Sequence, residues 1–174
     1  GQITMLRVVS GVLKSDSTVR NVTRGGDERL GHLMLLEGKT PTNVPEIHAG
    51  DIGAVAKLKD THTGDTIGDK HADFRVPPLH FPEPVLSYAM VPKTRGDEDK
   101  IGQSMHRILE EDPSVGYSRD PQTHDILLSG QGQMHIEVTV AKLRRRFGVE
   151  VSLKPPHIPY RETITAKAEA HGRH

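Results

Sequence analysis

The fold of the second half of this chain is decided by two stretches, DEDKIGQSMHRILEEDP at residues 97–113 and SGQGQMHIEVTVAKLRRRFG at residues 129–148. Apolar residues recur in both at intervals of three and four, which is typical of a helix with one buried face. They are Ile101, Met105, Ile108 and Leu109 in the first stretch, and Ile136, Val140, Leu143 and Phe147 in the second. We predict a helix over 97–111, ended by Asp112-Pro113, and another that follows Gly132 and ends at Gly148.

Short segments of strand-forming residues flank both predicted helices. They lie at 85–91, 115–118, 125–129 and 149–153, and most are bounded by Pro, Gly or Asp. Such composition favours strands. The predicted order is therefore βαββαβ, the split βαβ or ferredoxin-like arrangement.

Residues 1 to about 80 show no helical period. Gly- and Asp-containing turn signals recur along it, and short apolar stretches such as 33–36 and 52–56 lie between them. This indicates many short strands at a spacing of roughly 8 to 12 residues. This pattern predicts a small β-barrel or sandwich, and the whole chain is then of the α+β class.

The two halves are separated by a proline-rich segment. Four prolines fall between Phe74 and Pro84, where they stiffen the backbone and cannot donate to a sheet. We predict a β-barrel domain at 1–76, a semi-rigid linker at 77–84 and a ferredoxin-like domain at 85–162. The ends of the sequence lead us to expect an internal fragment, with 163–174 beginning a further domain.

Composition limits the functional classes. Hydrophobic residues make up 34% of the 174 residues and aromatic residues 3%, so each core must be small and aliphatic. The 23 basic residues equal the 23 acidic ones, which argues against a free-standing nucleic-acid binder. Without cysteine there are no disulfides, and no apolar run is long enough for a membrane span, so we expect a cytoplasmic protein without membrane contact.

No motif predicts catalysis or a cofactor. The glycine-bracketed turn at 129–132 lacks the Lys-Ser/Thr of a phosphate-binding loop, and we expect it to serve a tight strand-to-helix turn. The histidines lack metal-ligand spacing, because Thr139 stands four residues after His135 and Glu110 four residues after His106. We therefore predict no catalytic, metal-binding or cofactor-binding residue in this chain.

Two polar features of the second predicted helix are candidates for contacts. His135, Thr139 and Lys142 form a stripe beside the buried face, which is either a solvated edge or a contact surface. Arg144, Arg145 and Arg146 concentrate positive charge at the C-terminal end of the helix, where the helix dipole favours cations. The alternative reading of these arginines is contact with phosphate or an acidic protein surface.

Several motifs resemble elongation factor G, in matching order along nearly the whole chain. The segments 49–55 and 61–66 resemble its barrel domain, a translation-factor domain II. Resemblance to the next domain, domain III, is found at 81–85, 92–94 and 110–113 and in the pattern Ser-Gly-x-Gly-x-x-His-x-Glu at 129–137. The segment 159–164 resembles the link into domain IV. On this resemblance the first strand of the barrel precedes Gly1, and we expect an open sheet edge without it.

The resemblance implies a ribosome-dependent GTPase that drives translocation in translation elongation. GTP and magnesium would be bound by a nucleotide domain of the same polypeptide outside this chain, so we expect no GTPase activity here. In the family the barrel touches small-subunit ribosomal RNA, and domain III contacts the switch regions of the G domain and a small-subunit protein. Residues that match or extend the interdomain pocket for a fusidic-acid-type inhibitor are Pro82, Pro84, Asp112, His135, Thr139 and Lys142. We expect Arg144, Arg145 and Arg146 to contact the ribosome.

Some positions depart from the family pattern. Gln131, Gln133 and Met134 stand where the housekeeping factor usually has Met, Glu and Leu. Such departures point to an elongation factor G-like paralogue. Two alternatives remain open: another ribosome-bound GTPase of the ribosome-protection or release type, and a stand-alone RNA- or protein-binding module that would use Tyr88 and Tyr117.

Overall fold

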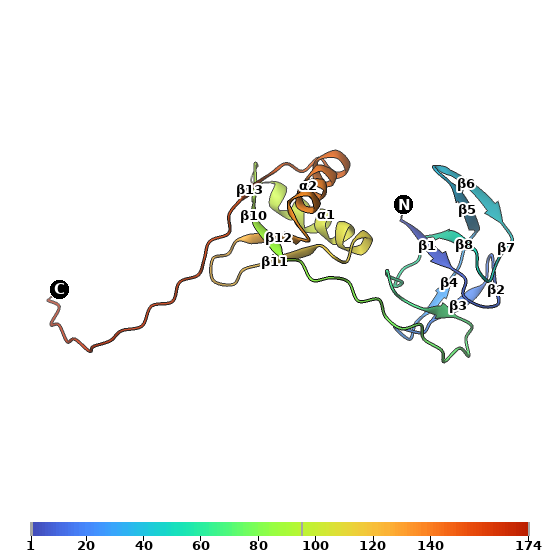
Figure 1. The fold of residues 1–174 in the computed structure, drawn as a ribbon, viewed down its shortest axis with the longest axis horizontal. Coiled ribbons are helices and arrows are strands. Elements are labelled where there is room, and N and C mark those ends of the chain that lie inside the picture. The colour runs from blue at the N-terminus through green and yellow to red at the C-terminus, as the bar shows by residue number, and fades with distance from the viewer. Residues whose placement is uncertain (1, 95, 174) are drawn as a thin grey trace. The chain divides into compact units, whose positions relative to one another are not determined.

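The computed structural model describes residues 2–94 and 96–173. The chain divides into two compact units, Gly1–His80 and Phe81–His174 (Figure 1). The division falls in the proline-rich segment, and residues 72–85 form neither helix nor strand. No helix among the described residues combines the length and the apolar character that a bilayer span requires.

The first unit is an antiparallel β-structure. Three sheets have the strand orders β1-β8-β5-β6, β2-β7 and β4-β3-β9. Every pairing is antiparallel, and β1 is at one edge of the largest sheet, where it pairs with β8 from Ile3–Ala56 to Arg7–Ile52. The strands are β1 Ile3–Arg7, β2 Val12–Lys14, β3 Thr18–Asn21, β4 Asp27–Arg29, β5 Leu33–Glu37, β6 Thr40–Val44, β7 Glu46–His48, β8 Ile52–Ala56 and β9 Ile67–Gly68.

The sheets of the first unit enclose a small aliphatic core. Buried side chains from β3, β5, β7 and β8 and from the loops between strands form it, and none of them is aromatic. This agrees with the low aromatic content of the sequence. The buried members are Val8, Val19, Leu30, Leu33, Ile47, Val55 and Leu58.

A buried carboxylate fixes the loop after β8. Glu28 of β4 is 5% exposed, and it accepts hydrogen bonds from the backbone N–H groups of Lys59 and Asp60 and from Thr61 Oγ1. Burial opposes its ionisation, but these hydrogen bonds outweigh burial and hold the pKa of Glu28 below its usual range. The inward-pointing charge is therefore fully hydrogen-bonded, as a buried charge must be.

The second unit has the predicted βαββαβ order. Its sheet has the strand order β11-β12-β10-β13, with all neighbours antiparallel. Figure 1 shows α1 and α2 lying across one face of this sheet. The elements are β10 Leu86–Pro92, α1 Asp97–Glu111, β11 Gly116–Arg119, β12 Ile126–Gly130, α2 Gln133–Phe147 and β13 Val151–Lys154.

The buried faces of both helices form the core of the second unit. Ile101, Met105 and Ile108 of α1 and Ile136 and Leu143 of α2 are all at most 1% exposed. These are residues that the helical spacing in the sequence placed on the inner faces. Met90, Val115, Leu128 and Val149 complete the buried cluster from the strands and loops.

Residues 155–173 follow β13 without forming a helix or strand. Near their start, Asp125 Oδ2 accepts a hydrogen bond from the backbone N–H of His157 at 3.0 Å and lies 2.8 Å from His157 Nδ1. The chain is thereby held against the loop that precedes β12. That residues 163–174 begin a further domain stays a prediction.

Candidate functional site

Asp112 and His135 meet where α1 ends and α2 begins. Asp112 is the residue after α1, and its backbone N–H donates to the Ile108 carbonyl in the last turn of that helix. His135 lies in the first turn of α2, after the glycine-bracketed turn. The distance between His135 Nε2 and Asp112 Oδ2 is 3.0 Å, and both side chains are partly exposed.

The hydrogen-bond partners of His135 fix its tautomer. The backbone N–H of Gln131 donates to His135 Nδ1 at 3.2 Å. Because a backbone N–H can only donate, Nδ1 must be the unprotonated nitrogen of the neutral ring. The hydrogen is then on Nε2, and it is donated to the Asp112 carboxylate.

Asp112 is held in its ionised form. Burial raises its pKa. Hydrogen bonds from the Ser114 hydroxyl at 2.6 Å, from His135 and from the Ser114 backbone N–H lower it by more, so that the pKa lies below its usual range. The carboxylate thus accepts hydrogen bonds from the loop after α1 and from the first turn of α2. It links the two helices of this unit at their adjacent ends.

The proline-rich segment reaches the same place. Gln131 Nε2 donates to the Pro82 carbonyl at 2.9 Å. The ring of Pro84 lies close to β11, because a Cβ built on Gly116 would be 3.3 Å from Pro84 Cγ. We call Pro82, Gln131, His135 and Asp112, which these hydrogen bonds connect in series, the polar junction.

Gln131 belongs to this site although it was not among the predicted site residues. Its backbone contacts His135, and its side chain contacts the proline-rich segment. The available signal was its departure from the usual Met of the resembled family, which replaces an apolar side chain by a hydrogen-bond donor.

The other two predicted residues of the α2 stripe have different surroundings. Thr139 is 2% exposed, and its Oγ1 donates to the His135 carbonyl at 2.9 Å, so its side chain contacts its own helix. Lys142 is partly exposed and lies near Glu111, whose pKa it helps to lower. The stripe is therefore polar and accessible at His135 and Lys142 but buried at Thr139.

The arginines at the end of α2 are exposed, and two of them form ion pairs. Arg146 Nη1 lies 2.7 Å from Glu111 Oε2, and the pKa of Glu111 is lowered mainly by this hydrogen bond. Arg144 Nε lies 3.3 Å from Glu150 Oε1. Arg145 has no ion pair within residues 2–94 and 96–173.

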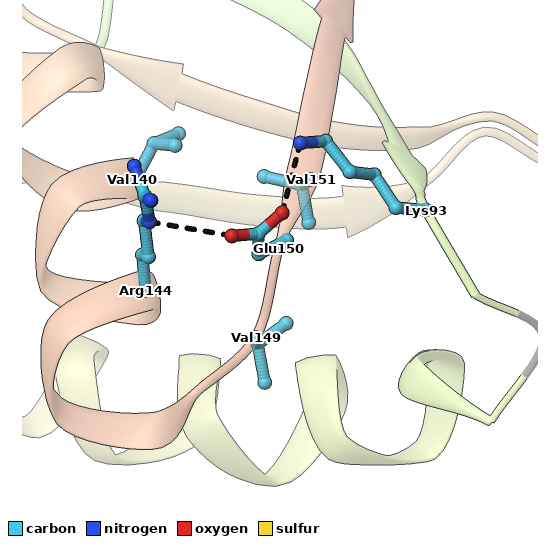
Figure 2. Close-up of a pocket in the computed structure, with 6 residues that line it drawn as sticks. All are labelled: Lys93, Val140, Arg144, Val149, Glu150 and Val151. Carbon is cyan, nitrogen blue, oxygen red and sulfur yellow. Dashed lines mark hydrogen bonds and ion pairs between the residues drawn. The ribbon is translucent and has the colours of Figure 1, made fainter.

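Arg144 also borders a hollow in the surface of the second unit. Figure 2 shows Glu150 between Lys93 and Arg144, with its second oxygen 2.8 Å from Lys93 Nζ. The hollow measures about 290 Å³, and Val140, Val149 and Val151 also line it. One carboxylate therefore balances two cations at its rim.

Within the described part of the chain, no three His, Asp or Glu side chains gather closely enough to hold a metal ion. The polar junction supplies a carboxylate, an imidazole and an amide whose hydrogen bonds are made to one another. These hydrogen bonds hold together the proline-rich segment, the first turn of α2 and the residue that follows α1.

Comparison with known proteins assigns both units. Residues 1–68 match the model of the family described as elongation factor Tu domain 2, and residues 81–155 match that of Elongation Factor G, domain III. The second match contains the whole polar junction.

A solved structure resembles both units together. It is the crystal structure of a protein from Thermus thermophilus, which shares 35% sequence identity with this chain at a TM-score of 0.82. The match covers 92% of this chain and 24% of the Thermus chain, so the present chain spans about a quarter of that protein. On these findings the chain belongs to the elongation factor G-like family, and it joins a β-barrel of the elongation factor Tu domain 2 type to an α+β domain of the elongation factor G domain III type.

Proposed function

We propose that this chain is the part of a ribosome-dependent GTPase that relays the state of a bound nucleotide to the small ribosomal subunit during translocation. GTP and magnesium would be held by a G domain of the same polypeptide, and this part would have no hydrolytic activity. The parent protein would work in the cytoplasm. Its partners would be small-subunit RNA and protein and its own G domain.

The observation that supports this proposal best is the polar junction. A serial hydrogen-bond path connects the proline-rich segment, through Gln131 and His135, to Asp112 at the end of α1. A displacement of the first turn of α2 by a contacting G domain would disturb this path at once. Relay between domains requires such an element with more than one arrangement.

The test uses the full-length factor that contains this chain. We expect His135→Ala to leave ribosome-stimulated GTP hydrolysis within about threefold of wild type and to slow single-turnover translocation about tenfold or more, since hydrolysis is then uncoupled from movement. Gln133→Ala is the matched control, because the hydrogen bond that the structure gives the Gln133 side chain is to Glu137 within α2 and does not belong to the polar junction. Equal loss of both rates, or no loss, would refute the relay.

Binding to the ribosome can be tested on the chain itself. Co-sedimentation with small ribosomal subunits should be weak, because few cations are involved, and it should weaken further as the salt concentration rises, because the contact is electrostatic. Replacing Arg145 by Glu should weaken it further, and replacing Glu162, an exposed residue of the C-terminal segment, by Gln should not. Binding to large subunits alone would contradict the proposed partner.

The stand-alone RNA-binding alternative is less well supported. Such a module would stack bases on exposed aromatic side chains of its sheet. Tyr88 and Tyr117 are instead partly buried and pack against the core that the helices cover. A ribosome-protection or release-type factor would share both domains, and the translocation assay distinguishes it from a translocase.

A further inference from the structure

The outer face of α2 carries an apolar stripe. With about 3.6 residues per turn, Met134, Val138, Ala141 and Arg145 lie above one another on one side of the helix. The opposite side holds the buried residues Ile136 and Leu143 of the core. The stripe is therefore centred where a surface helix normally places polar residues.

The stripe is open to solvent within the described structure. Met134 is 71% exposed, Val138 is 45% exposed, and Ala141 is also exposed. Single exposed apolar residues are common, but three in register along one helix face form a contiguous surface that favours a partner. An apolar helix stripe of this kind is a recurring mode of protein recognition.

The positive charge beside the stripe favours a partner that carries negative charge. Arg145 ends the stripe and has no ion pair among the described residues. Arg144 adjoins it, and it shares the single carboxylate of Glu150 with Lys93 at the hollow shown in Figure 2. The C-terminal end of this face thus has more cations than carboxylates and complements an acidic group.

The composition of the face favours protein over RNA. Its centre is aliphatic, and the hollow beside Arg144 has three valines in its lining. Recognition of single-stranded RNA uses aromatic side chains on which bases stack, and the stripe contains none. An aliphatic protein segment would cover the stripe and remove its apolar area from water.

We propose that the outer face of α2, formed by Met134, Val138, Ala141 and Arg145, is a docking site for a protein segment that is aliphatic along one side and bears carboxylates at the end that lies over Arg145. This goes beyond the proposed function: the stripe shares no residue with the polar junction, and of its members only Arg145 also enters the ribosome-binding test. The aliphatic side chains would contact Met134 and Val138. The carboxylates would pair with Arg145 and with Arg144 at the rim of the hollow.

The test measures binding of a defined probe to the whole chain. The probe is a fluorescent helical peptide with a leucine stripe and two glutamates at one end, and the comparison peptide has lysines in place of the glutamates. We expect anisotropy to report binding of the acidic peptide only. Val138→Ser should weaken it about tenfold, since it removes most of the apolar contact at the centre of the stripe.

Matched variants separate the face from general effects. Val85→Ser makes the same chemical change at a valine that is 79% exposed outside the stripe, and it should leave binding unchanged. Arg145→Glu should reverse the preference between the two peptides, so that the peptide with lysines binds more tightly than the peptide with glutamates. Circular dichroism checks that each variant is folded, as expected for exposed positions.

Four results would overturn the proposal. They are equal binding of both peptides, no binding of either, a concentration-dependent dimer that Val138→Ser dissolves, and binding of a single-stranded RNA or an anionic vesicle with the same sensitivity to Val138→Ser. The dimer would assign the face to a second copy of this chain. The last result would assign it to nucleic acid or lipid.

Discussion

Asp112 gives the polar junction a pH dependence at the scale of one residue. Its folded pKa is depressed by hydrogen bonds from Ser114 and His135, which outweigh burial. A carboxylate with a depressed folded pKa contributes stability that is present above the unfolded pKa of about 3.9. That contribution is lost as the pH falls through the folded value.

We therefore expect Asp112→Asn to lower the free energy of unfolding of the second unit by about 1 kcal/mol at neutral pH. The difference between wild type and variant should shrink as the pH falls below about 4 and through the lowered folded pKa of Asp112, because the wild-type carboxyl then becomes neutral like the Asn amide. Urea unfolding across this range measures it. Glu162→Gln, which neutralises an exposed carboxyl, should show no such difference, and a pH-independent gap for Asp112→Asn would contradict the assignment.

Gln131 makes a second residue-scale prediction. Gln131→Ala removes the hydrogen bond to the Pro82 carbonyl but keeps the backbone bond to His135 Nδ1. We expect little change in global stability, at most about 1 kcal/mol, because one neutral hydrogen bond is lost near the surface. The amide of Glu83 should become more mobile on the nanosecond scale in ¹⁵N relaxation, while Gln133→Ala leaves it unchanged.

At the scale of elements, α2 ends because Gly148 adopts a left-handed conformation. Its φ is 65°, and its N–H donates to the Arg144 carbonyl. A Cβ at this position would meet no atom within 4 Å, so the cost of Gly148→Ala comes from the backbone alone. We expect about 1 kcal/mol lower stability.

Gly132, at the other end of α2, is the control for that substitution. A Cβ there also meets nothing within 4 Å, but its φ of 171° is extended backbone that any residue adopts. Gly132→Ala should therefore be close to neutral in thermal unfolding. Equal destabilisation by both substitutions would show that the left-handed cap is not the cause.

The elements also show what the sequence could and could not predict. α1 and α2 were predictable because their apolar residues repeat at helical spacing and their ends have Pro and Gly signals. β4 and β6 were not, because Asp27–Arg29 and Thr40–Val44 are largely polar and carry no apolar pattern. Each forms a strand by pairing with the strand just before it in the chain, β3 or β5. The burial of Thr139 was equally hidden, since a polar residue beside a buried stripe gives no sign of its depth.

At the scale of the whole molecule, the two compact units have separate cores. We expect two calorimetric unfolding transitions. Leu30→Ala should destabilise only the first unit and Leu143→Ala only the second, each by about 2–5 kcal/mol, because both leucines are fully buried. A single transition, shifted by either substitution, would show that the units unfold together.

The double contact of His157 with Asp125 has a consequence for whatever the polypeptide attaches beyond it. Two hydrogen-bonding atoms of one residue converge on a single oxygen, so the departing backbone is restrained in direction as well as in position. A segment joined after this point would therefore leave the second unit in a direction set by the loop between β11 and β12. Without the Asp125 carboxylate, that segment would rotate freely about the end of β13.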